Sequence, residues 1–97
     1  GSTSCFTPWL WRRILRRESE NAPGSYVATS LERGPEYLAQ KVGEESAEVI
    51  VAALAQSPER LVEESADLLF HLHLLWRSKG LDPAAIDDEL RRRATSS

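Results

Sequence analysis

Helix start and stop signals divide the 97 residues into helical segments, and no segment reads as a β-strand. Thr7-Pro8, Ser57-Pro58 and Asp82-Pro83 each place a helix-capping side chain before a proline that suits the first helical position. Gly34 and Gly80 are typical of the residue just past a helix end. We therefore predict an all-α fold, a helical hairpin bundle of four to five helices. The expected helices lie at about 8–17, 25–33, 35–55, 58–79 and 83–92.

The length of 97 residues predicts a single domain. We interpret Gly1–Ser2 as an expression-vector remnant and expect 95–97 to fray. Cys5 is the only cysteine, so no internal disulfide is expected, which suits a reducing, cytoplasmic compartment. A net charge of −3 argues against a nucleic-acid partner. No apolar run reaches the roughly 18 residues that a membrane span needs, so no membrane partner is expected.

Hydrophobicity in the second half of the predicted helix 58–79 points to a partner subunit. Its first half is amphipathic, but residues 68–76 read LLFHLHLLW and are apolar on nearly every side. A helix of this kind must be covered all round. We expect a homo-oligomer, most simply a homodimer. The alternative is complete coverage by the first and fifth helices of the same chain.

Four carboxylates are spaced so that they can meet between two helices. Glu45 and Glu48 are three residues apart on one helix, and Glu64 and Asp67 repeat that spacing on the next. A short connection makes the two helices an antiparallel hairpin, and both pairs border its apolar face. Carboxylates crowded there would repel one another and lose solvation unless a cation neutralised them. Oxygen ligands alone favour Mg²⁺, or Mn²⁺ as a substitute, and Mg²⁺ commonly bridges to phosphate.

Two runs of sequence resemble a known enzyme family. KVGEESAE at 41–48 and ESADLLFHL at 64–72 resemble phosphoribosyl-ATP pyrophosphohydrolase of histidine biosynthesis, within the all-α, MazG-like nucleoside triphosphate pyrophosphohydrolase superfamily. The superfamily pattern, Glu-x-x-Glu followed by Glu-x-x-Asp, is met with fifteen residues between its halves. The resemblance extends over nearly the whole chain. It includes Ser25-Tyr26 and a closing Glu-Leu-x-x-Arg motif that ends at Arg93. Val27 departs from it, standing where threonine is usual.

The resemblance implies hydrolysis of the α–β phosphoanhydride of 1-(5-phosphoribosyl)-ATP to 1-(5-phosphoribosyl)-AMP and pyrophosphate, the second step of L-histidine biosynthesis. It also implies dimerisation, with active sites at the subunit interface. In the mechanism that we expect, the four carboxylates hold Mg²⁺ and Glu44 or Glu45 is the general base. Lys41 would contact phosphate as a point charge. The other expected substrate-binding residues are Arg17, Ser25, Tyr26 and Arg93.

Two other functions remain open from the sequence. A house-cleaning nucleoside triphosphate pyrophosphohydrolase would share the acidic motif and differ in substrate. A non-catalytic helical dimerisation module would need no carboxylates at the border of its core, and would not be stabilised by Mg²⁺.

Overall fold

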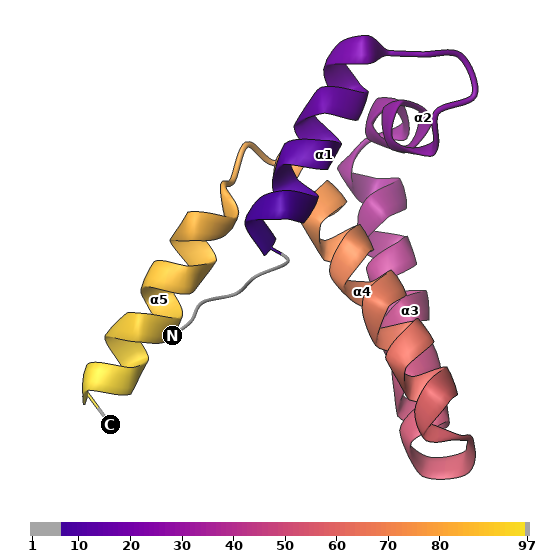
Figure 1. The fold of residues 1–97 in the computed structure, drawn as a ribbon, viewed down its shortest axis with the longest axis vertical. Coiled ribbons are helices and arrows are strands. Elements are labelled where there is room, and N and C mark those ends of the chain that lie inside the picture. Colours follow the sequence, from indigo (N-terminus) through magenta and orange to yellow (C-terminus); the bar gives the residue numbers. More distant parts are fainter. Residues whose placement is uncertain (1–6, 97) are drawn as a thin grey trace.

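The computed structural model describes residues 7–96, all of whose secondary structure is helical (Figure 1). The predicted all-α class is confirmed. Gly1–Ser2 and Cys5 lie outside the described residues. No helix in the described range combines the length and apolar character that crossing a bilayer requires. The helices are α1 (Thr7–Glu20), α2 (Tyr26–Arg33), α3 (Pro35–Ala55), α4 (Pro58–Ser78) and α5 (Pro83–Ser96).

Helix boundaries agree with the start signals and depart from the prediction at two C-terminal ends. Helix α1 continues to Glu20, where Asn21 takes a positive φ of 45° that this residue type tolerates better than most. Helix α5 continues past the predicted end at Arg92 to Ser96. Ion pairs three and four residues apart, including Arg91 with Asp87, support this last stretch.

The α3–α4 hairpin is the longest part of the fold. Ala55 ends α3 and Pro58 begins α4, so only Gln56 and Ser57 connect them. The Ser57 side chain accepts a hydrogen bond from the backbone N–H of Arg60 at 3.2 Å, which caps the start of α4. The two helices pack antiparallel, α1 and α2 lie at the open end of the hairpin, and α5 projects away from it (Figure 1).

The hydrophobic core lies at the open end of the hairpin. Ile14, Val27, Leu38 and Leu74 pack together there, one from each of the first four helices. The Arg77 guanidinium also donates to Glu18 at 2.6 Å and ties the end of α1 to α4. Helix α1 therefore covers part of α4, whereas α5 contributes no residue to this core. Complete coverage of α4 by the first and fifth helices, the alternative to a partner subunit, is not what the fold shows.

His73 is buried beside this core in an aromatic setting. Its ring centroid lies 4.7 Å from that of Trp76 and 6.4 Å from that of Trp11. Its Nδ1 lies 2.7 Å from the backbone oxygen of Leu69 and donates to it, and Nε2 has no partner among the described residues. Burial lowers the pKa of His73, because the charged ring would lose its hydration. The folded protein therefore holds His73 neutral.

This burial predicts a pH-dependent stability. An unfolded histidine takes up a proton near pH 6.5, and the folded His73 does so only at lower pH. The free energy of unfolding therefore falls as the pH drops below about 6.5, because the unfolded state binds the additional proton. Chemical denaturation at several pH values would measure this. The pH dependence of His73→Phe should be shallower in this range, and a curve parallel to that of the wild type would contradict the prediction.

Candidate active site

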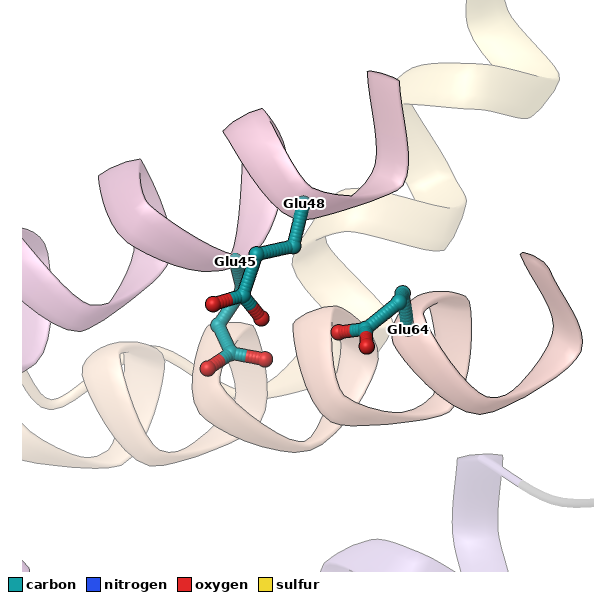
Figure 2. Close-up of side chains that lie close together, drawn as sticks. All are labelled: Glu45, Glu48 and Glu64. Atoms are coloured by element: carbon teal, nitrogen blue, oxygen red, sulfur yellow. The ribbon is translucent and has the colours of Figure 1, made fainter. Parts of the chain in front are cut away.

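Three glutamates meet between α3 and α4. One side-chain oxygen each from Glu45, Glu48 and Glu64 lies within 4.8 Å of the others. The α3 pair points toward α4, and Glu64 faces it from α4 (Figure 2). The three-residue spacing puts Glu45 and Glu48 on one face of α3, and the short turn brings α4 back alongside that face. We call these residues the carboxylate cluster.

The cluster holds more negative charge than its surroundings offset. Glu45 and Glu64 are buried, and the Oε1 atom of each has no hydrogen-bond partner among the described residues. A proton shared with Glu48, burial and the charge of Glu48 raise the pKa of Glu64, and the Arg60 guanidinium opposes this shift. A divalent cation would satisfy the buried oxygens and offset the repulsion. The residues present therefore fit a metal ion.

Two acidic residues of the predicted site lie outside the cluster. Asp67 is exposed and follows Glu64 by one turn on α4, close enough for its charge to contribute to the raised pKa of Glu64. Glu44 is exposed on α3, where its carboxylate lies 3.6 Å from the Lys41 ammonium and accepts from Gln40 at 3.2 Å. The structure thus brings together three of the four predicted metal ligands.

Lys41 connects the carboxylate cluster with α2. Partial burial would lower the pKa of Lys41, but the acidic groups of Tyr26, Glu44, Tyr37 and Glu45 together raise it. The ammonium is therefore charged at neutral pH and lies between the cluster and the start of α2. A phosphate held near the cluster would lie within the field of this cation.

The His71 ring makes two hydrogen bonds, and one of them holds the Tyr26 hydroxyl. The Nδ1 of His71 lies 3.0 Å from the backbone oxygen of Asp67, which can only accept, so this nitrogen carries the proton. With the proton on Nδ1, Nε2 of the neutral ring accepts a hydrogen bond that the Tyr26 hydroxyl donates at 2.7 Å. Tyr26 also stacks on Phe70, with ring centroids 6.0 Å apart. The position of the Tyr26 ring is thus set from α4.

Three predicted substrate-binding residues line one cavity, which we call the α1–α2 cavity. Its volume is about 470 Å³, and its lining includes Arg17, Ser25 and Tyr26. Ser25 also caps α2, its side chain accepting from the backbone N–H of Ala28 at 3.3 Å. Arg93, by contrast, lies on the projecting α5, where it donates to Glu89 at 2.9 Å.

Sequence reasoning missed three groups around these sites. Arg60 binds the carboxylate of Glu64, and their four-residue spacing on one helix would have indicated the pair. Arg13 lines the α1–α2 cavity one helical turn before Arg17. His71 was not among the predicted site residues, and its contact with Tyr26 joins residues 45 positions apart, which no local pattern reveals.

Comparison with known proteins identifies the family. Residues 9–94 match the family model of phosphoribosyl-ATP pyrophosphohydrolase. The chain belongs to this family. Phosphoribosyl-ATP pyrophosphatases of Sulfurisphaera tokodaii and Saccharolobus solfataricus are each 46% identical to it over 84 residues, which cover 87% of this chain and 89% of each relative. The phosphoribosyl-ATP pyrophosphatase of Metallosphaera sedula is 46% identical over 80 residues, covering 82% of this chain and 86% of that relative.

The carboxylate cluster predicts stabilisation by divalent cations. Mg²⁺ or Mn²⁺ at a hundredfold excess over its dissociation constant should add about 2.7 kcal/mol to the free energy of unfolding, because it binds the folded state alone. Glu64→Gln should lose most of this gain, measured as the change in Tm on adding the ion. Glu36→Gln, an exposed glutamate on α3, is the matched control. An equal gain in Glu64→Gln and wild type would contradict a metal ion at the cluster.

Proposed function

We propose that this chain hydrolyses 1-(5-phosphoribosyl)-ATP to 1-(5-phosphoribosyl)-AMP and pyrophosphate, the second step of L-histidine biosynthesis. The observation that carries this proposal is the family match over residues 9–94, which includes both helices of the carboxylate cluster. The relatives 46% identical to the chain are named for the same substrate. A general house-cleaning pyrophosphohydrolase has no comparable support.

The proposed cofactor is Mg²⁺, with Mn²⁺ as a substitute, held by Glu45, Glu48, Glu64 and Asp67. Three of these already converge, and Asp67 lies one turn along α4 from Glu64, near enough for its charge to help raise the pKa of Glu64. When bound, the ion would polarise phosphate oxygens and offset the charge that develops on the leaving pyrophosphate. The unpartnered buried oxygens of Glu45 and Glu64 support this assignment.

The general base in this proposal is Glu45 or Glu44. The base accepts a proton from the water that attacks phosphorus, as the bond between the α-phosphorus and the leaving pyrophosphate breaks. Glu45 is favoured because one of its buried oxygens has no partner among the described residues. The Glu44 carboxylate is exposed and engaged by Lys41 and Gln40.

The cations proposed to bind substrate are Lys41, Arg17 and Arg93. Lys41 lies nearest the cluster and would contact the triphosphate. Arg17 would act from the α1–α2 cavity together with Ser25 and Tyr26. Arg93 lies on α5, away from both sites, so its role requires α5 of a partner subunit.

A homodimer is the proposed assembly. Near the closed end of the hairpin, Ile50, Val51 and Leu54 of α3 are exposed, and Leu54 is 83% exposed. Val62 of α4 is likewise 69% exposed. Val51 lies beside Glu48 and Glu64 in a second, smaller cavity, so an apolar surface adjoins the cluster. Burying this surface against a second copy would remove it from water and enclose the metal site.

Substitutions that neutralise single proposed metal ligands test the proposed activity. Glu48→Gln and Asp67→Asn should each lower kcat for phosphoribosyl-ATP by on the order of 100-fold, because they remove charge that holds the ion. Pyrophosphate release at saturating Mg²⁺ is the measurement, and Glu36→Gln serves again as the control. Near wild-type rates in both variants would overturn the metal assignment. Absence of pyrophosphate release from phosphoribosyl-ATP by the wild type would overturn the function.

A charge placed in the apolar surface tests the dimer. Leu54→Glu should shift the protein from dimer to monomer at micromolar concentration, because an unpaired carboxylate would be buried at the interface. Light scattering coupled to size-exclusion chromatography measures the mass. Leu81→Glu, at an exposed leucine in the connection between α4 and α5, should leave the dimer intact. A monodisperse wild-type monomer would contradict the proposal.

A further inference from the structure

The α1–α2 cavity is separate from the carboxylate cluster. It lies where the end of α1, the connection to α2 and the middle of α4 meet, and no residue of the cluster lines it. On α4, Phe70 at the cavity follows Glu64 of the cluster by six residues, or about 9 Å along the helix axis. Lys41 interacts electrostatically both with Tyr26, which lines the cavity, and with Glu45 of the cluster, so the two sites lie within reach of one elongated molecule with two charged ends.

The charge of this cavity is positive. Arg13 and Arg17 are four residues apart, so both project from one face of α1, and both line the cavity. No aspartate or glutamate is part of its lining among the described residues. Arg17 pairs with Glu20 only at 3.8 Å and with both side chains well exposed, a weak ion pair, and Arg13 has no ion pair in residues 7–96. Two arginines so placed suit an anion.

The remaining walls suit a sugar attached to that anion. The rings of Tyr26 and Phe70 stack at one side of the cavity, and the hydrogen bond to His71 holds Tyr26 in place. Gly24 and Ser25 add backbone and hydroxyl groups at the start of α2. A volume of about 470 Å³ is within the range of small-molecule sites. Aromatic faces with a few polar groups are typical of a site that positions a small ligand.

We propose that the α1–α2 cavity binds the 5-phosphate of the phosphoribosyl group, with Arg13 and Arg17 as its ligands. The inference rests on the proposed function, because that substrate carries a triphosphate at one end and this isolated phosphate at the other. The carboxylate cluster with its cation takes the triphosphate, and the metal-free arginine cavity takes the phosphate monoester. Ordinary nucleoside triphosphates lack the second phosphate, so the cavity determines substrate specificity.

Steady-state kinetics of arginine variants test the specificity role. Arg13→Gln and Arg17→Gln should each lower kcat/KM for phosphoribosyl-ATP about 10-fold, mainly through KM, because each loses a charge-assisted hydrogen bond. ATP has the triphosphate alone, so its inhibition constant as a competitor should stay within about twofold in these variants. Arg12→Gln, an exposed arginine of α1 outside the cavity lining, is the control. Equal losses in the control and the cavity variants, or a parallel loss of ATP affinity, would overturn the proposal.

A titration of the wild-type protein with ribose 5-phosphate in EDTA separates this proposal from the proposed function. The NMR amide signals of Gly24 and Ser25 should shift with ribose 5-phosphate and not with ribose, and Arg13→Gln should weaken the binding. If the protein hydrolyses phosphoribosyl-ATP but these signals do not shift, the cavity assignment is wrong while the function stands. If ribose 5-phosphate shifts them but no pyrophosphate is released, the function fails and the cavity assignment is retained.

Discussion

The packing of α3 against α4 determines where the carboxylate cluster lies. A two-residue connection, Gln56-Ser57, forces the helices to run antiparallel, and the core at the open end holds their register. Glu45 and Glu48 therefore face Glu64 across the hairpin. This arrangement places buried carboxylates together, an arrangement that is unfavourable without a cation. Core burial at the other end of the hairpin offsets this local cost.

The core and the site occupy different parts of the same hairpin. Leu38 and Leu74 are fully buried near its open end, and the glutamates lie nearer its closed end. Between them, Lys41, Tyr26 and His71 form a polar zone in which α2 meets both long helices. The residues that stabilise the fold and the residues of the carboxylate cluster therefore occupy different stretches of the hairpin. This layout also places a cationic cavity and an anionic cluster within reach of one elongated substrate.

Local sequence signals accounted for most of the secondary structure and predicted that Glu45, Glu48 and Glu64 lie close together. The cap-proline pairs predicted where α1, α4 and α5 begin, and the glycines predicted where α2 and α4 end, because capping is a property of a few adjacent residues. The C-terminal ends of α1 and α5 were missed. Helix α1 runs to Glu20 and α5 to Ser96, and in α5 an ion pair between Arg91 and Asp87 supports the last turns. Carboxylate spacing indicated the cluster, but the same spacing could not show that Asp67 lies outside it, because side-chain direction depends on packing.

The sequence alone determined the helical class, the helix start sites, the family resemblance and the acidic motif, because each depends on residues close together in the chain. Only the tertiary structure decided which of these residues meet. It joined Tyr26 to His71, added Arg13 to the cavity of Arg17 and Ser25, and left α5 outside the core. Such pairings depend on the positions of helices that are distant in the chain. Those positions follow from burial of the core as a whole and from no short run of residues.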